Sequence, residues 1–413
     1  MELIKKSVTG MKDILPEEME LRDHVVRLVK EVYTSFGFQS IQTPCVEHIE
    51  NLCSNQGGEN EKLIFRIMKR GEKLDISGAQ NENDLCDSGL RYDLTLPLSR
   101  YYASNNSKLI MPFKALQMGN VFRADRPQKG RFREFMQCDI DILGEPGILA
   151  EIELINATTT LLGKLGLKDF KVRINDRRML KEMASSCGFE EESQQEVFII
   201  LDKMDKIGIG GVREELINSG FDRDSTDEYI SLFENAGNDP QKVAELTGSE
   251  NTAQISQSIR SIMDAVNAVR NSDFSVEFDP TLVRGMSYYT GTIFEIEMKE
   301  FGSSVAGGGR YDAMIGNFTG NPVPACGFSI GFERIITILA EKGYRPSDES
   351  SKMAFLVEKG ADAEKLGNIM KEADLLRKEG KTVRIDTMAK NRKFQKESLA
   401  AQGYTEFRDF FNK

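Results

Sequence analysis

Residues 121–143, VFRADRPQKGRFREFMQCDIDIL, decide the fold because they contain most of a long predicted β-hairpin. The pattern predicts one strand over 112–124 and a second over 132–143, joined by the charged turn RPQKGR. Successive side chains of a strand point to opposite faces, so the second strand has one mainly apolar face. Its other face carries the polar side chains Gln137, Asp139 and Asp141.

The rest of the chain adds helices, shorter strands and one long helical block to this hairpin. Apolar periodicity predicts helices over 17–36, 147–166, 362–378 and 392–401, and a mostly helical stretch over 176–272 with Gly-containing breaks, one of them near 207–211. Strands are expected at 39–43, 63–68, 274–278, 293–298, 353–357 and 382–386, and a strand that enters a helix at 326–340. We expect a polar surface loop at 75–88, a Gly-rich turn at 307–312 and a linker at 341–351. The sequence has no GxxxxGK[ST] motif and no GxGxxG at a strand-to-helix turn, which argues against P-loop and Rossmann sites.

Composition excludes several classes of site. The chain has 413 residues and a net charge of −11, so it is not a uniformly basic nucleic-acid coat protein. It has only two histidines, His24 and His48, which rules out a three-His zinc site and leaves few options for a His-based triad. The six cysteines are scattered without a CxxC pair, and no apolar run reaches the ~18–20 residues of a membrane helix. We expect a soluble, cytoplasmic protein with reduced thiols and no membrane partner.

Four stretches combine arginine or acid with small or aromatic residues. In LRYDLTLPL (90–98), Asp93 and Thr95 lie two apart, although Thr95 could equally be a helix N-cap. The stretch 121–137 holds five basic and two acidic side chains, which suits phosphate, although a solvated hairpin tip would show the same pattern. In LVRGMSYYTGTIFE (282–295) an arginine precedes two tyrosines, which could equally be core residues. In GGGRYD (307–312) and GFSIGFER (327–334), Arg310 and Arg334 could each reach an anion, although such glycines also occur in plain turns.

Taken together and in this order, these stretches resemble the class II aminoacyl-tRNA synthetases, and closely the histidyl-tRNA synthetase family, over about residues 8–340. TGMKDILP resembles the family's start, and FGFQSIQTPCVE resembles motif 1, with Pro44 as the proline of the dimer interface. VFRADRPQKGRFREFMQCDID resembles motif 2, and GFSIGFERI resembles motif 3. LVRGMSYYTGTIFE and AGGGRYD are similar to the two histidine-specific motifs.

The resemblance implies a role for each matching residue. The catalytic arginines would be Arg284 and Arg123, and neither histidine matches a site position. ATP would be held by Arg123, Asp125 and Arg334, with Asp125 where the family usually has Glu. The residues that would bind histidine are Asp93, Leu94, Thr95, Gln137, Asp141, Tyr288, Tyr289 and Tyr311. The tRNA acceptor end would meet Arg126, Gln128 and Arg131. No protein ligands are assigned to a metal; Mg²⁺ is expected with the ATP.

The implied fold is α+β: a class II synthetase-like antiparallel sheet flanked by helices, with a helical insertion and a small C-terminal α/β domain. The expected parts are 1–175 (catalytic domain with motifs 1 and 2), 176–272 (helical insertion), 273–342 (catalytic domain with the histidine-specific motifs and motif 3) and 352–413 (an abbreviated anticodon-binding-like domain). The implied activity is ATP-dependent ligation of L-histidine to tRNA(His) by a homodimer. The tail is shorter than the family's usual domain, which keeps open an alternative: the synthetase-like regulatory subunit of ATP phosphoribosyltransferase, which binds histidine without charging tRNA. Retention of Arg123, Arg284 and Arg334 favours the synthetase.

Overall fold

The computed structural model describes residues 3–53, 60–128, 130–283, 288–299, 302–345 and 351–412. The chain divides into two compact units. The first comprises Met1–Asp13 and Arg22–Gly343, and the second comprises Ile14–Leu21 and Tyr344–Lys413. Among the described residues, no helix has the length and apolar character needed to cross a bilayer.

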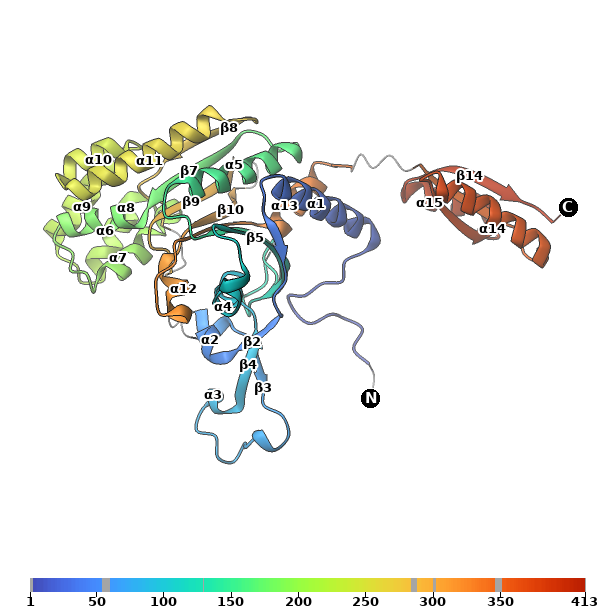
Figure 1. Cartoon of the computed structure of the whole chain (residues 1–413), viewed down its shortest axis with the longest axis horizontal. Coiled ribbons are helices and arrows are strands. Elements are labelled where there is room, and N and C mark those ends of the chain that lie inside the picture. Colours follow the sequence, from blue (N-terminus) through green and yellow to red (C-terminus); the bar gives the residue numbers. More distant parts are fainter. Residues whose placement is uncertain are drawn as a thin grey trace. The chain divides into compact units, whose positions relative to one another are not determined.

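An eight-stranded sheet forms the centre of the first unit (Figure 1), with the strand order β1-β5-β6-β11-β10-β9-β7-β8. The strands are β1 (Gln39–Ile41), β5 (Phe113–Phe122), β6 (Glu134–Leu143), β11 (Ala325–Ile330), β10 (Ser303–Arg310), β9 (Thr292–Met298), β7 (Phe170–Asp176) and β8 (Phe274–Phe278). All inner pairs are antiparallel, and only the two outermost pairs, β1 with β5 and β7 with β8, are parallel. The expected α+β fold around an antiparallel sheet is confirmed, with parallel strands added at both edges.

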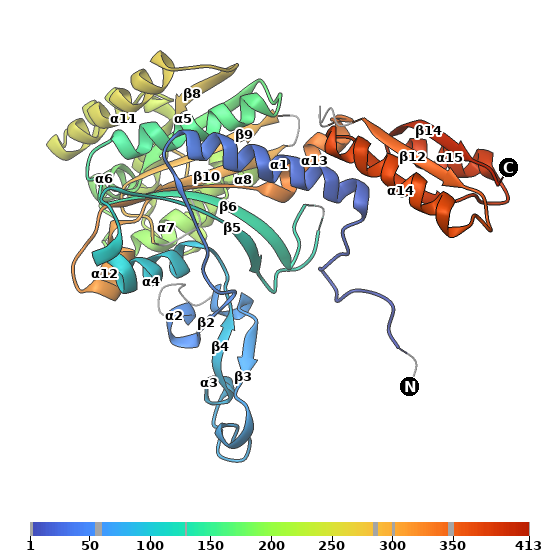
Figure 2. The same ribbon diagram turned by 45° about the vertical axis from the view of Figure 1, so that its right-hand side comes forward.

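The predicted hairpin is the longest pairing in this sheet. Strands β5 and β6 pair from Phe113 opposite Leu143 to Phe122 opposite Glu134. Cys138, Ile140 and Ile142 are almost fully buried on one face of β6, beside α1 (Pro16–Ser35) and α5 (Leu149–Lys164). These helices lie along one face of the sheet, while α4 (Thr95–Asn105) and α12 (Asp312–Thr319) lie on the other (Figure 2). The face that carries Gln137, Asp139 and Asp141 is therefore only partly covered by helices.

A helical block separates β7 from its parallel neighbour β8, as the sequence predicts. It contains α6 (Arg177–Ser186), α7 (Gln194–Leu201), α8 (Met204–Asn218), α9 (Arg223–Ala236), α10 (Pro240–Thr247) and α11 (Glu250–Ala268). The expected break near 207–211 is a kink inside α8, where Gly208 has φ +69° and ψ 172°. This backbone conformation favours glycine because a Cβ would be strained there.

Two sequence expectations about loops are wrong. Gly307–Arg310 form part of strand β10, because glycines without side chains fit between β9 and β11 where a Cβ at Gly308 would overlap the Gly327 carbonyl. The segment 75–88 is not entirely a loop, since it contains α3 (Glu82–Leu85) and the start of β4 (Cys86–Leu90). Strand β4 lies between β2 (Val46–His48) and β3 (Arg66–Met68) in a separate small sheet, next to α2 (Ile49–Cys53).

The second unit contains a three-stranded parallel sheet with the order β13-β12-β14. The predicted strands and helices are present as β12 (Lys352–Val357), α14 (Ala363–Lys378), β13 (Thr382–Thr387) and α15 (Arg392–Ala401). The last strand, β14 (Tyr404–Phe410), was missed by the sequence pattern because its residues are mostly polar and half-exposed. The core of this unit is apolar and includes Met353, Phe355 and Ile369.

Candidate active site

A cavity of about 610 Å³ opens over the polar face of β6. Most of the residues selected from the sequence line it, although they come from distant parts of the chain. They are Asp93, Thr95, Arg123, Asp125, Arg131, Gln137, Asp141, Tyr288, Tyr289, Tyr311 and Arg334. The alternation along β6 therefore identified one wall of the cavity correctly.

The aromatic end of the cavity is built around Asp141. Its Oδ1 accepts a 2.6 Å hydrogen bond from the Tyr311 hydroxyl. The ring of Tyr288 lies 6.1 Å from that of Tyr311 and 4.9 Å from that of Tyr289, measured between centroids. Burial raises the pKa of Asp141 to about 7, despite the hydrogen bond from Tyr311, which lowers it. Gly327 faces Asp141 across the sheet, and a Cβ there would overlap the carboxylate.

The loop after β4 reaches this end of the cavity through Asp93 and Thr95. Thr95 is the first residue of α4 rather than its cap, and Asp93 Oδ1 accepts from the Leu96 amide at 3.2 Å. Burial raises the pKa of Tyr288, and the Thr95 side chain lowers it. Leu94 has no exposed surface, and its carbonyl accepts from Gln117 Nε2 at 2.9 Å. Asp93 and Thr95 thus line the cavity, while Leu94 holds the loop against the sheet.

Basic side chains occupy the other end of the cavity. The Arg123 guanidinium lies 4.2 Å from the centroid of the Tyr92 ring and 5.2 Å from that of Phe135, so its plane is held in place. Its Nε donates to the Tyr92 carbonyl at 3.1 Å. Arg131 lies 3.5 Å from the Asp125 carboxylate. A fork of donors held in this way suits the phosphate oxygens of a nucleotide.

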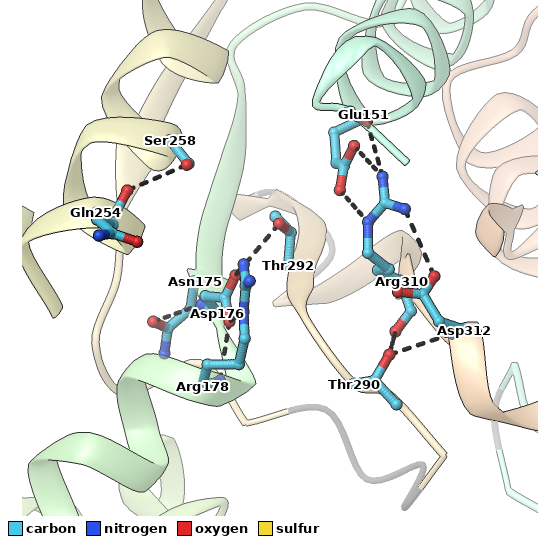
Figure 3. Close-up of polar contacts among 11 residues, drawn as sticks. Glu151, Asn175, Asp176, Arg178, Gln254, Ser258, Thr290, Thr292, Arg310 and Asp312 are labelled. Atoms are coloured by element: carbon cyan, nitrogen blue, oxygen red, sulfur yellow. Dashed lines mark hydrogen bonds and ion pairs between the residues drawn. The ribbon is translucent and has the colours of Figure 1, made fainter. Parts of the chain in front are cut away.

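The two arginines near the Gly-rich segments have different surroundings. Arg334 lines the cavity and donates to the Ser304 carbonyl. Arg310 instead forms two 2.8 Å hydrogen bonds with Glu151 and also contacts Asp312 (Figure 3). The expectation that Arg310 could reach an anion is wrong, because this buried pair and the carbonyls of Glu145 and Gly147 already bind its guanidinium.

The same close-up shows how the strands beside Arg310 are connected (Figure 3). The Asp312 amide donates to Thr290 Oγ1 at 3.1 Å, and Thr292 Oγ1 lies 3.4 Å from Asp176 Oδ2. Asp176 also accepts from the Arg178 side chain at 2.7 Å. These contacts join the start of α6 to the segment after Tyr289.

Several residues selected from the sequence do not line the cavity. Arg126 and Gln128 are exposed at the turn between β5 and β6, and Pro44 is exposed between β1 and β2. Arg284 lies outside the described residues. Their assigned roles remain predictions.

The charged side chains of the cavity wall that were not assigned a role from the sequence include Asp139, Glu295 and Arg173. These three belong to one row of paired residues that crosses the sheet from β5 to β7. In order, this row is Gln117, Asp139, Ser329, Gly307, Glu295 and Arg173. The alternation along β6 already placed Asp139 on the polar face. Glu295 and Arg173 could be found only from the strand register.

Within the described part of the chain, no group of three or more His, Cys, Asp or Glu side chains is placed to hold a metal ion. The carboxylate Glu295 at the cavity wall lies 3.7 Å from Arg173 Nη1. Mg²⁺ in nucleotide sites commonly uses only one or two protein carboxylates beside the phosphates, and Glu295 is a carboxylate of the cavity wall.

Comparison with known proteins agrees with this geometry. Residues 10–335 match the family model described as histidyl-tRNA synthetase. The histidine–tRNA ligase of Leifsonia xyli is 41% identical over 96% of this chain and 93% of its own, and that of Christiangramia forsetii is 35% identical over 84% and 80%. Among solved structures, histidyl-tRNA synthetase from Nostoc is similar with a TM-score of 0.79 and 25% identity, covering 97% of this chain and 90% of its own. An ATP phosphoribosyltransferase regulatory subunit/histidyl-tRNA synthetase from Bacillus halodurans has a TM-score of 0.81 over 100% of both chains, but at 21% identity it shows the fold alone.

Proposed function

The chain belongs to the histidyl-tRNA synthetase family, and from this premise we propose that its cavity activates L-histidine with ATP and transfers the histidyl group to tRNA(His). One observation carries the proposal, namely that buried carboxyl groups line one end of the cavity and arginines line the other. Asp93, Asp139 and Asp141 are each at most 4% exposed at one end, while Arg123 and Arg334 line the other. The cationic α-ammonium group of an amino acid beside an anionic nucleotide matches this distribution.

In the first step, a carboxylate oxygen of histidine attacks the α-phosphorus of ATP. The new O–P bond forms as the bond to the β-phosphate breaks, which releases pyrophosphate and leaves histidyl-adenylate. The attacking carboxylate and the triphosphate are both anionic, so the protein's task is to position these groups and to neutralise charge. Arg123 and Arg334 would contact the phosphates, the ATP would carry Mg²⁺, and Arg284 remains the predicted catalytic arginine.

In the second step, a hydroxyl of the terminal tRNA ribose attacks the activated carbonyl carbon, and AMP leaves with its phosphate oxygen. No protein nucleophile takes part in either step. Arg126, Gln128 and Arg131 would meet the acceptor end. In the second unit, the exposed Lys390 and Lys393 would contact the RNA backbone.

Selection of histidine would depend on hydrogen bonds to the imidazole ring. Asp141 and the tyrosine hydroxyls can accept from or donate to ring nitrogens. A buried site of this kind rejects analogues that leave its polar groups without partners, by factors of ~10⁴–10⁵ in favourable cases. The protein would act in the cytoplasm as a homodimer with Pro44 at the subunit interface.

The regulatory-subunit alternative predicts histidine binding without catalysis. Two assays separate the possibilities: histidine-dependent ATP–pyrophosphate exchange, followed by charging of tRNA(His). We expect both activities, and we expect Arg284→Ala to lose most of the exchange. Binding of histidine without exchange would overturn the proposal in favour of the alternative.

A further inference from the structure

Gln137 has one amide atom without a hydrogen-bond partner. Its Oε1 is buried and accepts no hydrogen bond from the described residues. The same side chain lines the cavity. A buried carbonyl oxygen without a donor is costly in a folded protein unless a ligand supplies one.

The other amide atom of Gln137 is held by two acceptors. Nε2 lies 3.0 Å from Ser329 Oγ and 3.5 Å from each carboxylate oxygen of Asp139. Ser329 lies directly opposite Asp139 in the pairing of β6 with β11. The strand register therefore brings Asp139 and Ser329 together on one side of the Gln137 amide.

The available protons determine which way this amide points. The Ser329 side chain, opposite Asp139 in the strand pairing, lowers the pKa of that carboxyl. Its oxygen lies 3.0 Å from Gln137 Nε2, an atom that can only donate. The Ser329 oxygen must then accept, and Gln137 must present its NH₂ group to it. A flipped amide would place its carbonyl oxygen beside the carboxylate, where two acceptors face each other. Asp139 thereby keeps the Oε1 atom of Gln137 pointing away from both Asp139 and Ser329.

We propose that Asp139 is a positioning residue that orients the Gln137 amide so that Oε1 accepts a hydrogen bond from the α-ammonium group of the substrate. This inference rests on the proposed function. An ammonium group has three donors and no acceptor, so it needs the surrounding oxygens that Asp93, Thr95 and Gln137 offer. The neutral imidazole ring has one donor and one acceptor, which fits the Asp141–Tyr311 end better.

The charge of the substrate supports the same arrangement. Burial and the neighbouring Asp141 raise the pKa of Asp139, while Arg123 lowers it. A protonated Asp139 could offer its own hydroxyl to Gln137 Oε1. An ammonium group bound nearby favours the ionised carboxylate, which can only accept hydrogen bonds. Binding of the cation and the orientation of the amide therefore reinforce each other.

The test compares two ligands that differ at the amino group. Histidinol keeps the ammonium group but lacks the carboxylate, and imidazolepropionate lacks the ammonium group. In Asp139→Asn the new side chain has the same shape but can face Ser329 with either amide atom. We expect the dissociation constant of histidinol, measured by calorimetry, to rise about tenfold. Imidazolepropionate affinity should stay within about twofold.

Two further variants sharpen the test, and the first of them remains available if Asp139→Asn folds poorly. Ser329→Ala removes one of the two acceptors and should weaken histidinol binding by a smaller factor, again with little effect on imidazolepropionate. In Asp139→Asn, adding Gln137→Ala should weaken histidinol binding much less than Gln137→Ala does in the wild type.

Equal weakening of both ligands, or no change in either, overturns the role of Asp139. This result is distinguishable from failure of the proposed function. A wild type that exchanges pyrophosphate with histidine but whose variants bind histidinol normally contradicts the inference alone. A wild type that binds neither histidine nor histidinol contradicts both.

Discussion

The carboxylate of Asp141 accepts a hydrogen bond from the hydroxyl of Tyr311 across 2.6 Å, although the two residues lie 170 positions apart in the chain. The contact joins the middle of the sheet to the start of α12. It also fixes an acceptor and an aromatic hydroxyl at the end of the cavity where we propose that the imidazole binds.

This pair can be tested by removing either partner. Asp141→Asn removes the charge and should raise the KM for histidine by about 10²-fold, because hydrogen bonds to charged groups are the stronger ones. Tyr311→Phe should have a smaller effect in the same direction. Exchange kinetics with varied histidine concentrations provide the measurement. An unchanged KM in both variants would exclude the pair from histidine binding.

The raised pKa of Asp141 predicts a specific dependence of stability on pH. The pKa is about 7 in the folded protein and about 3.9 in an unfolded chain. Between these values the folded state holds a proton that the unfolded state has lost. The contribution of Asp141 to the free energy of unfolding is therefore fully present below about pH 4. As the pH rises from 4 to 7, this contribution falls by up to about 1.4 kcal/mol per pH unit.

Asp141→Asn should remove this contribution. The unfolding free energy of the wild type should fall steadily between pH 5 and pH 7 relative to that of the variant. The variant therefore gains stability over the wild type as the pH rises. Denaturant unfolding of both proteins at several pH values measures this difference. Parallel curves would mean that the carboxyl is not protonated in the folded protein.

Arg123 should matter for the nucleotide more than for histidine. Its guanidinium is fixed between Tyr92 and Phe135, so its donors need no reorganisation when phosphate charge develops. Arg123→Ala should lower kcat/KM for ATP about 10²–10³-fold, and Arg123→Lys should restore only part of it because a lysine lacks the paired donors. Calorimetry with histidinol serves as the control, since its affinity should change little.

Arg310 should matter for folding instead. Its side chain forms a buried, two-point ion pair with Glu151. Removing one partner, as in Arg310→Ala, should cost about 3–5 kcal/mol, because it leaves a buried charge unpaired. The double variant Arg310→Met with Glu151→Leu should recover most of this loss. Denaturant unfolding would contradict the assignment if the single variant were as stable as the wild type.

Both histidines should be dispensable for the chemistry. His24 is half-buried on α1, where its Nδ1 lies 3.0 Å from Arg27 Nη2, while His48 is exposed on β2. Neither lines the cavity. The variant His24→Gln with His48→Gln should keep pyrophosphate exchange within about threefold of the wild type, since general acid–base catalysis typically contributes 10²–10⁴-fold. A loss of about 10²–10⁴-fold in exchange would instead show that one of these imidazoles acts in the chemistry.

The features predictable from the sequence were those with a local physical cause. The period of two along 132–143 separates Cys138 and Ile140 from Gln137 and Asp141, because consecutive side chains of a strand must face opposite ways. The apolar stripe of α1 follows in the same way from the helical period. The missed strand β14 lacks such a pattern, since its side chains are half-exposed and mostly polar.

The tertiary structure decided what each charged residue touches. Arg310 and Arg334 both belong to glycine-rich stretches, yet one is bound by Glu151 and the other lines the cavity. Glu151 comes from a helix far away in the chain, so no local pattern could assign it to Arg310. Gly307 forms part of a strand for a similar reason, because the strands that pair with it come from elsewhere in the sequence. The sequence by itself determined the family, the α+β fold and the polar face of β6. Only the packing of distant segments decided which of its arginines and carboxylates meet at the site.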